Sequence, residues 1–248
     1  MTRTFEMPQV VMIAGGVGSR LASAHPGVAK CMVPVEGRPF LGYVLDLLAS
    51  QRVTKLHLCL GRHANQVTRY LAAHGPSGLK ITTSVEKSPQ GTAGCLANAG
   101  RFIDSTFILL LGDTYTPVDL EDLVRRFCAS GRAAAMVVFR NFDALVPSNV
   151  SIANGIVEKY DKSAGRGVFE YVDYGIAILH RATLAGLPQR RPVDLSVLIE
   201  QLASSNQLAA LDVSERFYEI GTPESLQAFS TLVLEGNLPR VSYKRGPS

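Results

Sequence analysis

The residues best suited to chemistry in this 248-residue chain follow two apolar segments. The first segment, Val10–Ala14, leads into a glycine-rich stretch that contains Arg20, and Lys30 lies further along. Glycines let the backbone approach a ligand closely, and arginine and lysine bind phosphate groups. The second segment, Phe107–Leu111, is followed by Asp113, a carboxylate suited to Mg²⁺. These residue types predict chemistry on an anionic substrate that contains phosphate.

The spacing within the glycine-rich stretch excludes two common nucleotide-binding loops. A dinucleotide-binding G-x-G-x-x-G pattern needs a glycine where Leu21 stands. A Walker A loop ends in Gly-Lys-Ser or Gly-Lys-Thr, whereas here Arg20 follows Ser19. Two interpretations remain, a phosphate-binding loop of another class and a structural turn with unrelated cations nearby.

The elements that would position these residues alternate along the first part of the chain. Short apolar runs typical of buried parallel strands are separated by segments with a helical spacing of apolar residues. This alternation predicts an α/β fold with a Rossmann-like, predominantly parallel twisted sheet and helices on both faces. Ligands of such sheets bind at the carboxyl ends of the strands. The expected strands are 10–14, 56–60, 81–85, 107–111 and 133–139, and the expected helices are 39–49, 64–73, 92–102 and 120–129.

The chain changes character after Arg140 and becomes rich in short β-segments. An Asn154-Gly155 pair is a hairpin signal between two of them. We predict one domain over residues 1–234, with a first part at 9–140, a small β-rich part at 141–234 and a flexible basic tail at 235–248. The expected strands here are 150–153, 156–160, 169–179 and 208–213, and the expected helices are 193–204 and 223–234.

Composition and charge exclude several function classes. The net charge of +4 comes without a concentrated basic stripe, so we expect no nucleic-acid partner. The chain has no run of about 18 apolar residues and no secretory signal, so we expect no membrane association and a cytoplasmic location. The cysteines are scattered without a CxxC pair, which favours buried, reduced thiols over disulfides or zinc. They are Cys31, Cys59, Cys95 and Cys128.

Seven segments, in order along the chain, resemble the motifs of sugar-1-phosphate nucleotidylyltransferases. AGGVGSRL at 14–21 and AKCMVPVEGRPF at 29–40 are similar to the family's Gly-Gly-x-Gly-Thr-Arg-Leu and Pro-Lys-Pro-Met-x-Pro-Val-x-Gly-Lys-Pro. The resemblance covers roughly 9–234 and is nearest to the heptose-1-phosphate guanylyltransferases. Longer members carry a C-terminal β-helix, which we do not expect here. The remaining matches are EKSPQGTAG at 86–94, LGD at 111–113, YDK at 160–162, YVDYG at 171–175 and FYEIGTPESL at 217–226.

The resemblance implies a reaction in which a sugar 1-phosphate attacks the α-phosphate of an NTP in line, giving an NDP-sugar and pyrophosphate. Such transfers depend mainly on positioning and charge neutralisation. By similarity, Arg20 holds the leaving pyrophosphate, Lys30 bridges the α-phosphate and the incoming phosphate, and Lys162 holds the sugar phosphate. Asp113 is expected to bind Mg²⁺ together with Glu219, which stands where the family usually has Asp.

The base of the nucleotide is expected to meet Glu86, which matches the family position that reads the base edge. A carboxylate only accepts hydrogen bonds, and guanine offers N1–H and N2–H₂ side by side, so Glu86 favours GTP. Uridylyl enzymes can also use Glu at this position, so the base stays open. The predicted nucleotide-binding residues are Ala14, Gly15, Gly16, Gly18, Ser19, Glu86, Gln90, Gly91, Thr92 and Gly112.

The sugar site departs most from the family pattern. Asp161 stands where a Glu usually contacts sugar hydroxyls, and its shorter side chain leaves room for a larger sugar such as a heptose. Ser148-Asn149-Val150 replaces a Tyr-Gly-Val stretch beside the sugar. Gln90 either contacts the base or serves its own loop. The predicted sugar-binding residues are Asn149, Asp161, Asp173, Tyr174 and Gly175, and for Tyr174 a place in the core is an equal alternative.

Several alternatives stay open on the sequence. The chain could use mannose 1-phosphate with GTP, could depend on UTP or CTP, or could be a catalytically silent regulatory homologue that binds an NDP-sugar. A metal-dependent glycosyltransferase is expected to have an Asp-x-Asp motif after a strand in the middle of the sheet. This chain has Asp113-Thr114-Tyr115 there, which does not match that motif. The apolar helix at 195–202 is compatible with a homo-oligomer and equally with core burial.

Overall fold

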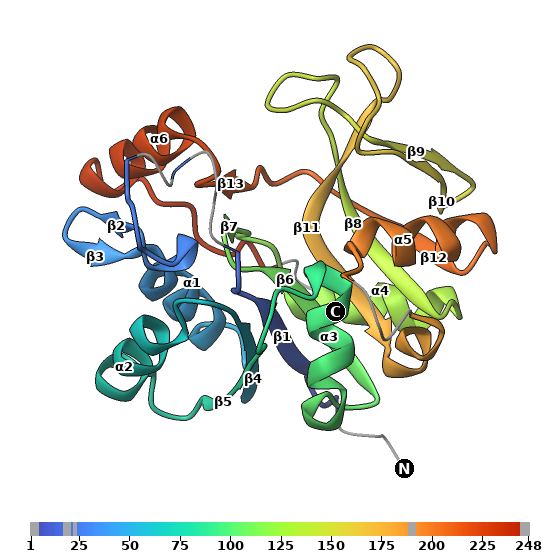
Figure 1. Cartoon of the computed structure of the whole chain (residues 1–248). Helices are drawn as coiled ribbons and strands as arrows, with labels where there is room; N and C mark the ends of the chain where they lie inside the picture. Colours follow the sequence, from blue (N-terminus) through green and yellow to red (C-terminus); the bar gives the residue numbers. More distant parts are fainter. Residues whose placement is uncertain (1–4, 17–20, 22–23, 188–191, 244–248) are drawn as a thin grey trace.

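A computed structural model describes residues 5–16, 21, 24–187 and 192–243 (Figure 1). Nine strands in these ranges are β1 (Gln9–Ile13), β4 (Lys55–Leu60), β5 (Lys80–Val85), β6 (Thr106–Leu111), β8 (Ala134–Arg140), β9 (Val150–Ala153), β10 (Ile156–Tyr160), β11 (Tyr171–His180) and β12 (Leu208–Val213). They form one sheet in the order β5-β4-β1-β6-β11-β8-β12-β10-β9. The first four strands in this order are parallel, so their carboxyl ends meet at one edge.

The predicted α/β fold is confirmed, with one difference in the sheet. β11 runs antiparallel between β6 and β8, because the chain enters it from a loop after β10 and not through a crossover helix. β12 is parallel to β8, and β10 and β9 extend the sheet in antiparallel pairings. The sheet is therefore parallel in its first part and mixed in its second.

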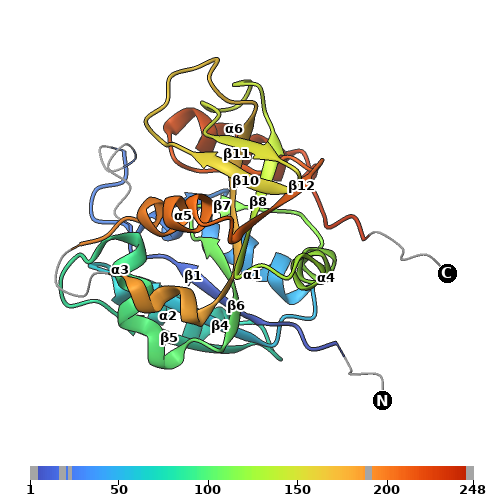
Figure 2. The same cartoon turned by 90° about the vertical axis from the view of Figure 1, so that its right-hand side faces the viewer.

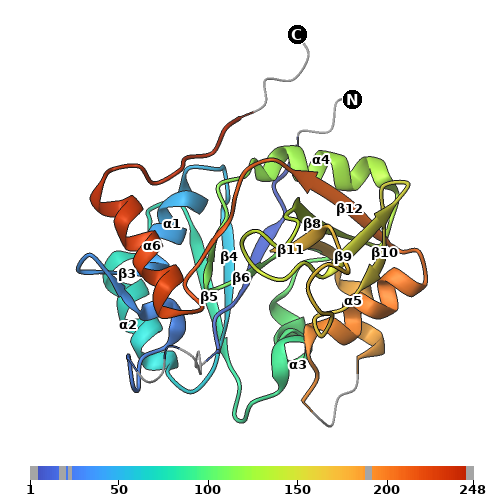
Figure 3. The same ribbon diagram turned by 90° about the horizontal axis from the view of Figure 1, so that it is seen from above.

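The helices cover both faces of the sheet, as predicted. They are α1 (Phe40–Ala49), α2 (Ala64–His74), α3 (Gly91–Ala99), α4 (Leu120–Ser130), α5 (Leu195–Ser204) and α6 (Pro223–Leu234). The apolar faces of α1, α2 and α4 join one buried cluster, and those of α3 and α5 join another. Figures 2 and 3 show α4 on one side of the sheet and α3 and α5 on the other.

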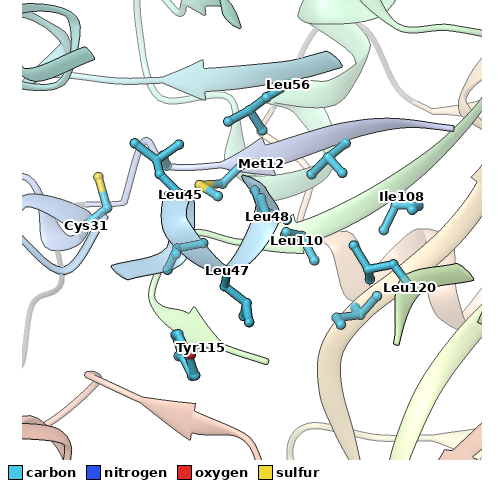
Figure 4. Packing of buried hydrophobic residues seen from close by; sticks show 14 of the residues in the cluster. Met12, Cys31, Leu45, Leu47, Leu48, Leu56, Ile108, Leu110, Tyr115 and Leu120 are labelled. Carbon is cyan, nitrogen blue, oxygen red and sulfur yellow. The ribbon is translucent and has the colours of Figure 1, made fainter. Parts of the chain in front are cut away.

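Side-chain alternation along the central strands feeds the two cores. Val10 and Met12 of β1 face the first cluster, and Val11 between them faces the second. Figure 4 shows Met12, Leu56 and Leu110 of neighbouring strands facing Leu45 and Leu48 of α1. Because β1 is buried on both faces, its residues from Val10 to Ile13 are all apolar.

Short elements that carry no sequence periodicity complete the fold. A hairpin joins β2 (Pro34–Val35) to β3 (Arg38–Pro39), and a two-stranded ribbon pairs β7 (Thr114–Tyr115) with β13 (Tyr218–Glu219). The predicted helix 92–102 ends as α3 at Ala99 and continues as a 3₁₀ turn over Gly100–Phe102. The predicted helix 193–204 begins at Leu195 because the Asp194 side chain caps it.

The segment after α6 contacts the domain in the part that the structure describes. The Tyr115 hydroxyl donates to the Pro239 carbonyl at 2.8 Å, and the Tyr243 hydroxyl donates to the Ser50 carbonyl at 2.7 Å. The flexibility of the tail and the domain boundaries stay predictions.

The cysteines agree with the prediction except at one position. All four are free, and Cys31, Cys59 and Cys95 are buried. Cys128 is exposed, so the prediction that it is buried was wrong. The buried residues of α4 are Leu120, Leu123, Val124 and Phe127, and Cys128 lies in the last turn of the helix at the edge of this buried stripe. Separately, no helix in the described ranges is long and apolar enough to cross a membrane.

Tyr174 of β11 lies in the core. Its side chain has 0% exposed surface, and its ring packs against Phe217 with centroids 5.4 Å apart. A side chain without exposed surface cannot touch a bound sugar, so the predicted sugar contact of Tyr174 was wrong. Its hydroxyl has no hydrogen-bond partner among the described residues.

The unpaired hydroxyl of Tyr174 generates a stability prediction. We expect Tyr174→Phe to raise the free energy of unfolding by about 1 kcal/mol, because a buried polar group without a partner destabilises the fold. Urea denaturation measures this change. Tyr160→Phe is the matched control and should lower stability, since the Tyr160 hydroxyl donates to Asp173 at 3.4 Å. A loss of stability in Tyr174→Phe would contradict the assignment.

Candidate active site

A cavity of about 680 Å³ lies beyond the carboxyl ends of β1 and β4. It is the place where an open α/β sheet is expected to bind its ligand. Five predicted nucleotide-binding residues line it, which are Gly15, Gly16, Glu86, Gly91 and Thr92. Ala14 and Gly112 lie at the adjoining strand ends and are not among its lining residues. Gly18, Ser19 and Arg20 lie outside the described residues.

Backbone hydrogen bonds hold the loops of this edge together. The Gly112 N–H donates to the Ile13 carbonyl at 2.9 Å, and the Glu86 N–H donates to the Leu60 carbonyl at 3.0 Å. The Ala14 N–H likewise donates to the Cys59 carbonyl at 2.9 Å. These bonds fix where each strand releases its loop, and so they fix the side chains that follow.

The loop between β5 and α3 shapes one wall of the cavity. One carboxylate oxygen of Glu86, Oε2, accepts from the Gln90 N–H at 3.0 Å. The Gln90 side-chain amide donates to the Ser88 carbonyl at 3.1 Å and to its hydroxyl at 2.8 Å. Of the two roles considered for Gln90, the structure therefore favours the one in which its side chain stabilises its own loop.

Gly91 begins α3 in a conformation that excludes other residues. Its φ is +75°, and a Cβ added there would lie 2.4 Å from the Val193 carbonyl oxygen. The same carbonyl accepts from the Ala93 N–H at 2.9 Å. Residue 193 thus packs directly against the start of α3. The first turn of α3 lines the cavity, and the N-terminus of a helix favours an anionic ligand.

Two predicted catalytic residues meet in the structure. The Lys30 ammonium forms an ion pair with Asp113 Oδ2, although the residues are far apart in the sequence. Both side chains are mostly buried, at 17% and 26% exposure. Asp113 Oδ1 accepts from the Thr114 hydroxyl at 3.2 Å. The pair places one positive and one negative group at the carboxyl end of β6, next to the end of β1.

Asp113 and Glu219 are neighbours across the β7–β13 ribbon. Glu219 pairs in register with Thr114, and the Ile220 N–H donates to the Asp113 carbonyl at 3.0 Å. The ribbon thus offers two carboxylates, the hard oxygen donors that a divalent cation such as Mg²⁺ prefers. No cluster of three or more metal-binding side chains occurs in the described residues. The donor set therefore fits a metal that takes its remaining ligands from substrate phosphates and water.

The predicted sugar-side residues form a connected group, apart from Tyr174. The Asn149 side-chain oxygen accepts from the Asp173 N–H at 2.9 Å, and the Asn149 carbonyl accepts from the Asp161 N–H at 2.9 Å. Gly175 has a φ of +83° and donates its N–H to Asp173 Oδ1 at 2.9 Å, where the register between β8 and β11 shifts. The structure brings four of the five residues together.

The two carboxyl groups of this region differ in environment. Burial raises the pKa of Asp173, although the Gly175 N–H and the Lys162 ammonium oppose the effect. Hydrogen bonds from the Ser163 hydroxyl and N–H lower the pKa of Asp161. One oxygen of Asp161 accepts both of these bonds, at 2.6 and 2.8 Å. Asp161 therefore stabilises its own turn, and its predicted contact with the sugar stays a prediction.

Arg62 and Asp194 are among the residues of the site that were not predicted. Arg62 lines the cavity immediately after β4, and the rule of looking beyond each strand's carboxyl end would have found it. Asp194 accepts from the Lys162 ammonium at 3.1 Å and precedes α5. An Asp before an apolar helical pattern is an N-cap signal, but its contact with Lys162 depends on the tertiary fold.

The fold and the site define a nucleotide-binding α/β enzyme, and comparisons with known proteins give its family. A sequence profile described as nucleotidyl transferase matches residues 9–235. The chain belongs to this family, and the predicted resemblance to sugar-1-phosphate nucleotidylyltransferases is confirmed. It is an enzyme of the nucleotidyltransferase class.

Relatives of several specificities are similar to this chain. D-glycero-alpha-D-manno-heptose 1-phosphate guanylyltransferase of Campylobacter jejuni is 25% identical, covering 89% of this chain and 98% of that protein. Glucose-1-phosphate thymidylyltransferase of Streptomyces antibioticus is also 25% identical, covering 94% and 68%. The crystal structure of HddC from Yersinia pseudotuberculosis complexed with GMP-PN has a TM-score of 0.78 at 24% identity, covering 92% and 100%, and supports the fold.

The close approach at Gly91 generates a prediction. We expect Gly91→Ala to lower the free energy of unfolding by more than about 2 kcal/mol and to weaken nucleotide binding, because Ala strains the positive φ and displaces residue 193. Urea denaturation and an equilibrium titration with GTP measure the two effects.

Gly78→Ala is the matched control for this variant. Gly78 also has a positive φ, +87°, but no described heavy atom lies within 4 Å of an added Cβ. It should cost about 1 kcal/mol and leave GTP affinity unchanged. Equal effects of the two variants on affinity would contradict the role given to the Gly91 contact.

Proposed function

We propose that this enzyme joins GTP and a heptose 1-phosphate to give GDP-heptose and pyrophosphate. One observation carries the proposal: Lys30 and Asp113 pair at the same sheet edge that holds Glu86 and the nucleotide cavity. A cation, a carboxylate pair and a base-reading group at one edge are what nucleotidyl transfer to a sugar phosphate needs.

The reaction is an in-line displacement at the α-phosphorus. An oxygen of the sugar phosphate forms the new bond to the α-phosphorus, and the bond from that phosphorus to the bridging oxygen breaks, releasing pyrophosphate. Lys30 neutralises charge on the α-phosphate and the incoming phosphate, and Lys162 holds the sugar phosphate. Arg20, which follows the glycine-rich loop, is assigned to the leaving pyrophosphate.

Asp113 and Glu219 would hold a Mg²⁺ ion. When bound, the ion supplies charge neutralisation to the phosphate oxygens. The Asp113 carboxylate also pairs with the Lys30 ammonium. That pairing holds the lysine and the carboxylate together at the place where the phosphates would bind.

Two features support the choice of substrates. Glu86 lines the cavity and has one oxygen bonded to its own loop, which leaves the second oxygen to accept from a donor such as the N1–H of guanine. The short side chain of Asp161 leaves more room for the sugar than a Glu would. The Campylobacter relative is named for a heptose substrate and a guanylyl group, in keeping with both features.

A substrate panel tests this proposal. We expect pyrophosphate release with Mg²⁺ to be confined to GTP with heptose 1-phosphate among GTP, ATP, UTP and CTP, each paired with heptose, mannose and glucose 1-phosphates. Asp113→Asn and removal of Mg²⁺ by EDTA should each lower the rate at least about 100-fold, because the phosphate charges lose their counter-charge. Pyrophosphate release with another pair of substrates would still agree with a nucleotidyltransferase but would show that the proposed substrates are wrong. If no pair of substrates gives pyrophosphate but the protein binds an NDP-sugar, a regulatory homologue would be favoured.

Base selection has its own test in Glu86→Gln. The amide keeps an oxygen for the Gln90 N–H but offers guanine a weaker acceptor and an unwanted donor. We expect kcat/KM for GTP to fall about tenfold, mainly through a higher KM for GTP. An unchanged kcat/KM for GTP would show that Glu86 does not read the base.

A further inference from the structure

Asp194 joins three segments that are far apart in the sequence. Its Oδ1 accepts from the Lys162 ammonium at 3.1 Å and from the Ser196 N–H at 2.9 Å. Its Oδ2 accepts from the Thr92 hydroxyl at 3.0 Å. The Thr92 hydroxyl oxygen in turn accepts from the Leu195 N–H at 2.7 Å. One carboxylate therefore links Lys162 to residues 86–92, which are the loop between β5 and α3 together with the start of that helix and are called the nucleotide loop below.

The position of this carboxylate is fixed relative to the nucleotide loop. The Val193 N–H donates to the Gln90 carbonyl at 2.8 Å, and the Val193 carbonyl accepts from the Ala93 N–H at 2.9 Å. These bonds hold the start of α5 against the start of α3. Asp194, the N-cap of α5, therefore cannot move without disturbing the loop that carries Thr92.

The charge of Asp194 is stable in this place. Burial opposes ionisation, but the Ser196 N–H and the Lys162 ammonium outweigh it and lower the pKa of Asp194 to about 2. The N-termini of α3 and α5 both lie here, and their dipoles favour a negative charge. The carboxylate thus stays ionised throughout the neutral pH range and continuously attracts the lysine.

We propose that Asp194 is a positioning residue for Lys162. It holds the ammonium beside Thr92, between the nucleotide loop and the sugar side, so that the sugar phosphate meets a cation already in place. A lysine ammonium has three N–H donors, and the bond to Asp194 leaves two of them for a phosphate. This inference rests on the proposed function, because it assigns Lys162 to the sugar phosphate.

The alternative is an ordinary surface ion pair, and the chain contains one for comparison. Lys55 and Asp104 lie 3.0 Å apart with 46% and 47% of their side chains exposed, against 50% and 52% for Lys162 and Asp194. Lys55 begins β4 and Asp104 precedes β6, so this pair lies at the opposite edge of the sheet from the cavity. It provides a control of equal exposure and length.

The test is the kinetics of Asp194→Ser. Serine keeps an N-cap oxygen for α5 but removes the charge that holds Lys162. With saturating GTP, we expect the KM for heptose 1-phosphate to rise about threefold to fivefold, with a smaller change in kcat. The KM for GTP should rise by less than this, because Thr92 loses its bond to Asp194 but keeps the bond from the Leu195 N–H. Asp104→Ser should change none of these quantities.

A double-mutant cycle shows whether Asp194 acts through Lys162. Lys162→Met lowers activity on its own, and Asp194→Ser should add no further loss in that background. Equal losses in both backgrounds would overturn the inference, as would a rise in the KM for GTP of the same size or an unchanged KM for the sugar phosphate. If the unsubstituted chain releases no pyrophosphate with any pair of substrates, the proposed function fails first. If the unsubstituted chain is active but the losses of activity from Lys162→Met and Asp194→Ser are additive, the inference about Asp194 is wrong and the proposed function still holds.

Discussion

The parallel pairing of β1 with β4 and β6 is the constraint on which the rest of this site depends. It brings the carboxyl ends of three strands to one edge, and backbone bonds between the strand ends keep the following loops in place. The glycines after β1, Glu86 after β5 and Asp113 after β6 all owe their positions to this edge. Two buried cores, one on each face, hold the strands in register.

Charge organises the site within that frame. Lys30 and Asp113 neutralise each other across the ends of β1 and β6. Burying either group alone would be costly, so the pair is stable only because both residues arrive at the same point. Lys162 and Asp194 repeat the arrangement at the boundary between the nucleotide loop and the sugar side, in a more exposed setting. In both places a carboxylate holds a lysine ammonium, which limits where that ammonium can lie.

Strand β11 in the second half of the molecule carries two of the predicted sugar-binding residues on opposite faces. The side chain of Tyr174 packs in the first core, whereas the carboxylate of Asp173 accepts from the hydroxyl of Tyr160, which belongs to the second core. The alternation of a strand explains why adjacent residues of one motif have such different roles. The small β7–β13 ribbon then brings Glu219 beside the segment that holds Asp113.

Local sequence patterns were enough to predict the alternating elements, the glycine-rich loop and the charged residues of the site. Each of these depends on local spacing, so most helices and strands are found within a residue or two of their predicted bounds. The family motifs likewise marked Lys30, Asp113 and Glu86 before any geometry was known. The tertiary structure alone decided the antiparallel place of β11, the burial of Tyr174, the exposure of Cys128 and the link from Asp194 to Lys162 and Thr92. These features depend on contacts between residues distant in the chain, and no local period or spacing encodes which distant segments will meet.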